Sequence, residues 1–191
     1  MSRHLVPLTL ICTLITAGLA HSTTVIPPTF EVLVANANTI FVGEVIGQRA
    51  EWEATPNGRS IVTYVMFRVE EVWKGAAGAV TQLEFLGGTI GDMKMEVVGM
   101  PTFRLGQRDV LFVGSTVRAV SPLVGFMHGR MRIERDVMSG VDRVRTHDGQ
   151  SLGSPAQIGV QRANSLASIT PMRLSELAAA VRLRLSAERA R

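Results

Sequence analysis

Cysteine is almost absent from this sequence, which has a single residue of that type, Cys12. Cys12 lies inside an apolar segment near the start of the chain, and Ile11 precedes it, so the small residue of a lipid-attachment signal is missing. The segment fits a removable signal peptide, and the mature chain would then contain no cysteine. Disulfides and cysteine-ligated zinc are therefore excluded from the mature protein, whose fold must be held by its core.

Aromatic residues are also scarce, at 5% of the chain, and lysine occurs only as Lys74 and Lys94. Proteins that bind single-stranded nucleic acid usually stack bases on aromatic rings along a basic groove. The formal net charge is +4, but after the first 20 residues the basic excess is confined to residues 173–191. The body of the chain is neutral, and we expect no nucleic-acid partner.

Most common motifs of catalysis and metal binding are missing as well. The chain has no His-Glu-x-x-His pair, no phosphate-binding loop with its lysine and no acidic calcium loop. Ser121, His128 and Asp148 are the residue types of a catalytic triad, but a triad is defined by geometry, and any chain of this size contains such residues. The sequence therefore predicts no catalytic residue, no metal ligand and no cofactor.

What the chain does contain begins with residues 1–20, a short basic head followed by an uncharged apolar run that ends in Gly18-Leu19-Ala20. Small residues at the third and last positions are typical of a signal-peptide cleavage site. The run is shorter than the roughly 20 residues that a membrane-spanning helix needs, which disfavours the alternative of an uncleaved anchor. We expect export to the periplasm or the extracellular space, without stable membrane insertion after cleavage.

After residue 20 the chain is patterned mainly as β-structure. Thr29 is placed to cap a short helix that contains Phe30. Glu70 and Glu71 interrupt the alternation of the longest strand, which predicts a β-bulge. Strands are expected at 39–48, 60–73, 80–86, 89–98 and 110–113, followed by an exposed hairpin formed by 125–136 and 141–145.

The predicted organisation is a β-barrel domain at 21–148, a linker at 149–169 and a C-terminal helix at 170–191. Thr170 is the expected N-cap of that helix, with Pro171 at its first position. An apolar stripe on the helix predicts docking on the β-structure rather than on a membrane surface. The stripe consists of Leu174, Leu177, Ala178, Val181 and Leu185.

The stretch from Gly99 to Val113 is interpreted as the segment around which the rest of the fold is organised. Pro101 and Gly106 would set the path of a loop across one end of the β-structure, and the apolar run after it would form a buried strand. Phe103, Leu111 and Phe112 are expected to fill the interior together.

The order of these landmarks resembles a family of exported bacterial proteins of unknown function. The matching motifs are Val42-Gly43-Glu44-Val45, the strand from Thr63 to Val69 with Lys74 and Gly75 after it, Gly87-Gly88, the loop and strand with Gly99, Pro101, Phe103, Gly106, Leu111 and Phe112, and Gly125 with Gly129-Arg130. The residues that we take as its structural signature are Gly43, Lys74, Gly75, Gly87, Gly88, Gly99, Pro101, Gly106 and Phe112.

This resemblance covers roughly residues 29–136 and implies a small curled OB-like β-barrel. Together with the patterns above, the predicted fold is mainly β: such a barrel with a β-hairpin extension, a short N-terminal helix and a C-terminal amphipathic helix. Such a barrel is similar to that of netrin-type modules and tissue metalloproteinase inhibitors. Inhibitors of that class depend on an N-terminal cysteine that reaches the protease zinc, which the expected mature chain lacks. Zinc-directed inhibition is therefore not implied, and no catalytic residue comes with the resemblance.

Three functional hypotheses follow. The first is a non-enzymatic binding module for an unknown protein or envelope ligand, with Phe103, His128 and Arg130 as its binding candidates. The second is a small exported hydrolase or metal-dependent enzyme, in which His128 would be essential. The third is an accessory partner or inhibitor of an exported protease.

Overall fold

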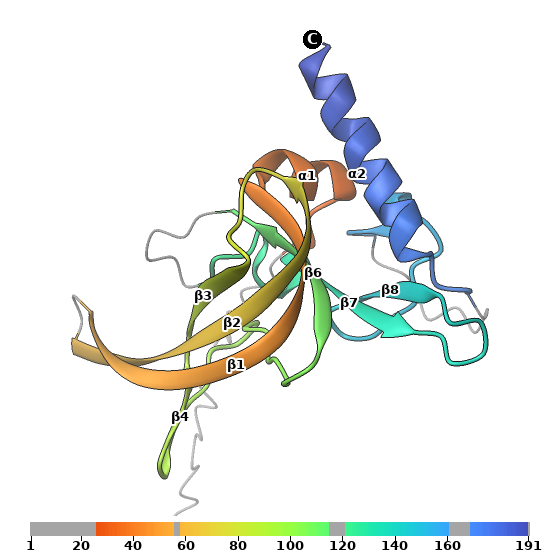
Figure 1. The fold of residues 1–191 in the computed structure, drawn as a ribbon. Coiled ribbons are helices and arrows are strands. Elements are labelled where there is room, and N and C mark those ends of the chain that lie inside the picture. Colours follow the sequence, from red (N-terminus) through yellow and green to blue (C-terminus); the bar gives the residue numbers. More distant parts are fainter. Residues whose placement is uncertain (1–25, 56–57, 115–120, 161–168, 191) are drawn as a thin grey trace, which may run out of the picture.

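A computed structural model describes residues 26–55, 58–114, 121–160 and 169–190, and its fold is mainly β with two α-helices (Figure 1). The predicted signal peptide and Cys12 lie outside these residues. In chain order the elements are α1 (Phe30–Asn36), β1 (Thr39–Thr55), β2 (Gly58–Lys74), β3 (Val80–Leu86), β4 (Gly88–Ile90), β5 (Met93–Met95), β6 (Arg108–Val113), the 3-10 turn η1 (Phe126–Gly129), β7 (Arg130–Arg135), β8 (Asp142–Thr146), the 3-10 turn η2 (Pro155–Gln157) and α2 (Leu174–Arg189).

The main sheet has six antiparallel strands in the order β3-β2-β1-β6-β7-β8. Its strands curl, and the long β1–β2 ribbon sweeps away from the rest of the molecule (Figure 1). Among the described residues no ladder joins the two outer strands, β3 and β8, so the sheet is open at both edges. The mainly β prediction is confirmed, whereas a closed barrel is not seen.

Bulges bend the β1–β2 ribbon, and the one predicted at the paired glutamates is confirmed. Glu71 pairs with Val42 and Val69 pairs with Gly43, which leaves Glu70 as the extra residue on β2. Two further register shifts follow Ile40 and Val45. Each extra residue increases the local twist and bend of its strand, which gives the ribbon its sweep.

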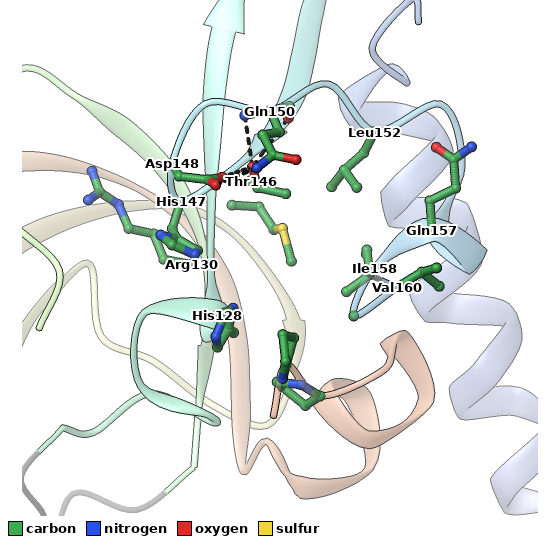
Figure 2. A pocket seen from close by; sticks show the side chains of 14 residues that line it. His128, Arg130, Thr146, His147, Asp148, Gln150, Leu152, Gln157, Ile158 and Val160 are labelled. Carbon is green, nitrogen blue, oxygen red and sulfur yellow. Dashed lines mark hydrogen bonds between the residues drawn. The ribbon is translucent and has the colours of Figure 1, made fainter. Parts of the chain in front are cut away.

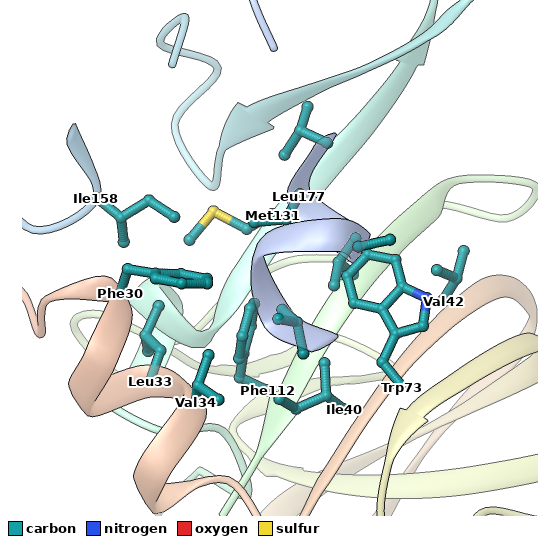
Figure 3. Close-up of a cluster of buried hydrophobic side chains, with 14 of the residues drawn as sticks. Phe30, Leu33, Val34, Ile40, Val42, Trp73, Phe112, Met131, Ile158 and Leu177 are labelled. Atoms are coloured by element: carbon teal, nitrogen blue, oxygen red, sulfur yellow. The ribbon is translucent and has the colours of Figure 1, made fainter. Parts of the chain in front are cut away.

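Two hydrophobic cores cover opposite faces of the sheet. Successive side chains of a strand point to opposite faces, and on β6 Val110 and Phe112 belong to one core while Leu111 and Val113 belong to the other. The helix-side core packs α1 and α2 on the sheet (Figure 3). The expectation that Phe112 fills the same interior as Phe103 is therefore wrong, because Phe103 lies in the second, groove-side core. That core consists of Phe41, Val45, Val65, Phe67, Leu83, Phe85, Phe103, Leu111, Val113 and Leu123.

Helix α1 is held at both ends by the residues that the sequence singles out. The predicted N-cap is confirmed, since the Thr29 hydroxyl accepts a hydrogen bond from the Val32 amide at 3.4 Å. At the other end the Lys74 ammonium donates to the carbonyl oxygens of Val34 and Ala35, at 2.7 and 3.1 Å. A cation at the C-terminus of a helix satisfies unpaired carbonyls and the helix dipole, so Lys74 ties β2 to α1.

Two predicted elements differ from the structure. Residues 89–98 do not form one strand but a small hairpin of β4 and β5, which turns at Gly91 with φ of 56°. Helix α2 begins at Leu174 rather than at Pro171, with Arg173 as N-cap and Glu176 closing a capping box. The Glu176 carboxylate accepts a hydrogen bond from the Arg173 amide at 2.9 Å. This capping box needs the glutamate three residues after the N-cap, a spacing that Arg173 has and the predicted cap Thr170 lacks.

The C-terminal half is more tightly integrated than its sequence suggests. The β7–β8 hairpin is not an exposed appendage, because it continues the main sheet through β6 and buries Met131 and Val144. In the described part of the predicted linker, Leu152 and Ile158 pack into the helix-side core. Helix α2 docks by its apolar stripe, as predicted, with Leu177 and Val181 fully buried. No helix within the described ranges is long and apolar enough to cross a membrane.

Candidate functional site

Two hollows in the surface bring polar and apolar side chains together. The first, which we call the histidine cavity, has a volume of about 310 Å³ and lies between the segment before α1, η1, the end of β8 and η2 (Figure 2). Its apolar walls are Pro27, Pro28, Met131, Leu152, Ile158 and Val160, and its polar side chains are His128, Arg130, Thr146, His147, Asp148, Gln150 and Gln157.

His128 and His147 face each other edge to face, with ring centroids 5.0 Å apart. Burial lowers the pKa of His128, and the His147 charge lowers it further, against the opposing effect of Asp148. Burial also lowers the pKa of His147; Asp148 raises it, and the guanidinium groups of Arg130 and Arg132 lower it. Both imidazoles are therefore neutral at neutral pH, and each has one ring nitrogen that donates and one that accepts.

Asp148 serves the turn after β8. It accepts hydrogen bonds from the Thr146 hydroxyl and, at 2.7 Å, from the Gln150 amide. Burial would raise the pKa of Asp148, but these bonds and the charge of His147 hold the pKa below its usual value. The carboxylate is thus ionised and already engaged.

The catalytic triad considered from the sequence is not assembled. Ser121 is buried away from the histidine cavity, and its hydroxyl accepts from the Leu123 amide at 3.3 Å. In the part of the chain that the structure describes, no group of three or more histidine, cysteine, aspartate or glutamate residues is placed to hold a metal ion. Of the three binding candidates, His128 and Arg130 line this cavity and Phe103 does not.

Arg130 and Phe103 form an internal latch. Arg130 is 3% exposed; its Nε lies 3.0 Å from Oδ1 of Asp109, its Nη1 donates to the Thr102 carbonyl at 2.6 Å, and its guanidinium carbon lies 4.4 Å from the centre of the Phe103 ring. Burial raises the pKa of Asp109, and the charges of Arg130 and Arg132 oppose that shift. The latch fastens the loop before β6 to the sheet, so both residues act as structural members.

The second hollow, which we call the loop groove, has a volume of about 640 Å³ and lies between the β1–β2–β3 face and residues 94–103. Phe103 borders it with one edge while its ring packs on Phe67 and Phe85, at centroid distances of 5.3 and 4.9 Å. The other lining residues are Gln48, Arg49, Ala50, Thr63, Val65, Leu86, Gly87, Gly88, Thr89, Lys94, Met95, Glu96, Val97, Val98, Met100, Pro101 and Thr102.

The groove combines an apolar lining with charges that are already paired. Val98 is 98% exposed and is one of the lining residues of the groove. Lys94 pairs with Glu96, and Nε of Arg49 lies 2.7 Å from a carboxylate oxygen of Glu51. Apolar hollows with a few polar groups at the rim are the usual form of ligand sites.

The Gly87-Gly88 pair creates this groove by letting the chain cross close to the sheet. Gly88 has φ of 142°, and a Cβ there would lie 2.3 Å from the hydroxyl oxygen of Thr63. That hydroxyl donates to the Gly87 carbonyl at 2.6 Å. Any side chain would lift the crossing segment off the strands, so this part of the signature has a steric cause.

Gly106 and Gln107 fasten the other end of the loop. The Gly106 amide donates to the Val45 carbonyl, and the Val45 amide donates to the Gln107 carbonyl, both at 2.8 Å. Gly106 has φ of 76°, in the region that glycine favours. The stretch after Gly99 is thus a rigid wall of the groove, held by β1 at one end and by Arg130 in its middle.

Sequence reasoning missed the loop groove and the histidine pair. The signal for the groove was the cluster of methionine and valine residues at 93–100, which looked like the inner face of a single strand. No protein-family model, curated protein or solved structure matches this chain, so the site stands on its own geometry.

Proposed function

We propose that this protein is an exported, non-enzymatic binding module and that the loop groove is its ligand site. The observation that carries the proposal is the groove itself: a hollow of about 640 Å³ with a rigid wall, an apolar lining and a fully exposed valine at its mouth. Leaving Val98 in water costs hydrophobic free energy that a ligand covering it would recover, at about 25 cal/mol for each Å².

The export part of the proposal rests on residues 1–20, whose basic head, apolar run and small-residue end have the form of a signal peptide. N-terminal sequencing of the protein purified from the envelope of its host would give His21 as the first residue. A first residue at Met1, in protein recovered from the membrane fraction, would contradict cleavage.

We further propose that the fold is OB-like. The strand order β3-β2-β1-β6-β7 supports this, because a three-stranded meander whose first strand pairs with a later hairpin is the arrangement of that partly open barrel. Ligands of OB folds often lie across the face of the second and third strands, and β2 and β3 contribute to the loop groove.

Capture of ligands from the host's envelope fraction tests the binding function. The immobilised protein is compared with Val98→Arg, which places a long cation at the mouth of the groove without touching the core, because Val98 is almost fully exposed. Leu183→Arg on α2 is the matched control, since Leu183 is 72% exposed and remote from the groove lining. We expect the wild type and the control to retain the same ligand and Val98→Arg to lose at least about tenfold, by the cost of burying an unpaired charge. Equal recovery on all three proteins would refute the groove as the site.

The histidine cavity supports a second candidate function, a small hydrolase or metal-dependent enzyme. Protein zinc sites use three or four ligands, and the two neutral imidazoles, with ring centroids 5.0 Å apart, offer two of them. Zinc titration monitored by calorimetry, on wild type and His128→Ala, decides this candidate: stoichiometric zinc that the substitution removes would raise it above the binding module.

A further inference from the structure

The outer half of β1 has a free edge. Pairing between β1 and β6 ends at Glu44, and the last backbone contacts on that side are those of Val45 with Gly106 and Gln107. From Gly47 to Thr55, β1 pairs with β2 on one side, and no described strand pairs with it on the other. A row of unpaired N–H and C=O groups is a template for another extended chain.

This free edge forms one side of the loop groove. Gln48, Arg49 and Ala50 line the groove together with Val97 and Met100 from the opposite wall. A chain that lies along the free edge, where it borders the groove, would therefore meet main-chain donors and acceptors of β1 and the apolar side chains of the opposite wall. That combination is the usual basis of recognition by strand addition.

The two faces of the edge differ in chemistry. On the groove face, Gln48 and Ala50 stand opposite Val65 and Thr63 of β2. On the other face, Arg49, Glu51 and Glu53 stand in a row, with one more carboxylate than guanidinium.

The two carboxylates of that row are already held in place by neighbouring side chains. Glu51 pairs with Arg49, and Glu53 accepts a hydrogen bond from the Tyr64 hydroxyl at 2.5 Å, which raises the pKa of Tyr64 to about 12. A strand added beside this row gains from basic side chains on this face, because opposite charges across neighbouring strands attract.

We propose that the loop groove takes an extended polypeptide segment of alternating apolar and basic residues, which adds to β1 along Gly47–Thr55. The inference rests on the proposed function and names the class of its ligand. Apolar side chains of the segment lie on Val97, Val98 and Met100, and its basic side chains face Glu51 and Glu53.

Calorimetric titration with synthetic peptides tests this class. The probe is an acetylated and amidated peptide of about nine residues that alternates valine and lysine, which matches the free edge in length. One comparison peptide carries N-methyl groups on alternate amides that remove the main-chain donors, and another replaces lysine with glutamate. We expect N-methylation to weaken binding at least about tenfold, because it blocks the ladder, and the glutamate peptide to bind about fivefold more weakly than the lysine peptide.

The variant Glu51→Lys sharpens the test, with Glu188→Lys on α2 as its matched control. Glu51 is half exposed and pairs with Arg49, which is half exposed as well, so its reversal leaves the core intact. We expect Glu51→Lys to invert the preference between the lysine and glutamate peptides and Glu188→Lys to leave it unchanged. Equal binding of the N-methylated peptide would overturn strand addition.

The remaining outcomes separate this inference from the proposed function. If no peptide binds while Val98→Arg still loses the captured envelope ligand, the binding module stands and the extended segment is wrong. If no peptide binds and Val98→Arg loses nothing, both fail. A protein that dimerises in sedimentation experiments, and becomes monomeric on Glu51→Lys, would assign the edge to a second copy and overturn the inference.

Discussion

The two halves of β1 show how one strand can serve both stability and recognition. From Thr39 to Val45 the strand runs between two other strands with a core on each face, and Ile40, Phe41 and Val42 are at most 1% exposed. From Gly47 to Thr55 the same strand keeps one neighbour, and Trp52 is 37% exposed. The sequence changes accordingly from a mainly apolar stretch to one in which most residues are polar or small.

The division between the halves falls at the register shift after Val45. The bulge turns the outer half away from β6, so this half gains no partner strand and its edge stays open. The part of β1 available for binding therefore begins where its pairing with β6 ends. The packed half, Thr39 to Val45, is stable and holds the open half in place.

The largest effect is expected at Phe103, in the groove-side core that the packed half of β1 shares. Its ring is 7% exposed and packs on Phe67, Phe85 and Arg130. Phe103→Ala should lower the free energy of unfolding by roughly 3–5 kcal/mol, since it removes a buried ring and leaves a cavity. Urea denaturation followed by circular dichroism measures the loss. An unchanged midpoint would mean that the ring belongs to the open region.

A smaller loss is expected for Asp109→Asn. The substitution keeps the shape of the side chain but removes the charge that faces Arg130, which is 3% exposed. We expect about 2–3 kcal/mol, because a buried guanidinium is left without a counter-ion. The control is Glu44→Gln, which breaks the exposed ion pair with Arg68 and should cost less than about 1 kcal/mol. Equal costs for the two variants would contradict the latch.

The histidine cavity predicts a dependence of stability on pH. The folded protein lowers the pKa of His128 and His147 below their ordinary value of 6.5, so the unfolded chain binds protons first as the pH falls. Stability is then fully present above pH 6.5 and declines as the pH drops below it. Thermal unfolding between pH 7.5 and pH 5 should show this decline in wild type and a weaker one in His128→Gln and in His147→Gln. Parallel curves for all three proteins would exclude the histidines as its cause.

The smallest effect is expected at Trp52, in the open half. Trp52 packs mainly against the Arg59 guanidinium, 5.4 Å from the ring centre, and is partly exposed. Trp52→Ala should cost no more than about 1 kcal/mol, in the range of exposed cation–π contacts and surface substitutions. A loss as large as that of Phe103→Ala would show that the ribbon is a second folding core and would remove the contrast between the halves.

Much of the fold was predictable because its signals are local. Strand β3 and the cap at Thr29 follow from alternation and side-chain chemistry within a few residues. The bulge at Glu70 was visible as two like charges that break a period of two. The start of α2 was mispredicted because Thr170 and Pro171 formed one plausible start, whereas the capping box at Arg173 and Glu176 formed the real one.

The candidate site was less predictable because it depends on contacts between distant segments. His128 and His147 meet only because β7 and β8 pair in one register. Arg130 was named as a binding candidate, and its burial against Asp109 was not foreseen. The overlooked signal was Asp109 itself, because a carboxylate inside an apolar strand needs a buried cation. The hairpin of β4 and β5 was mispredicted as one strand, because the closely spaced methionines near Gly91 fit both structures.

Helix α2 completes a core whose other residues are synthesised much earlier. The helix-side core draws Phe30 and Leu33 from α1 and Leu177 and Val181 from α2, residues separated by most of the chain. Contacts of such long sequence separation form late, because the loop between them must be closed first. A chain emerging from the ribosome therefore leaves the helix-side core incomplete until Leu177 and Val181 in the first half of α2 are made. Phe30 and Leu33, which are synthesised early, have to wait for these late residues before the core can close.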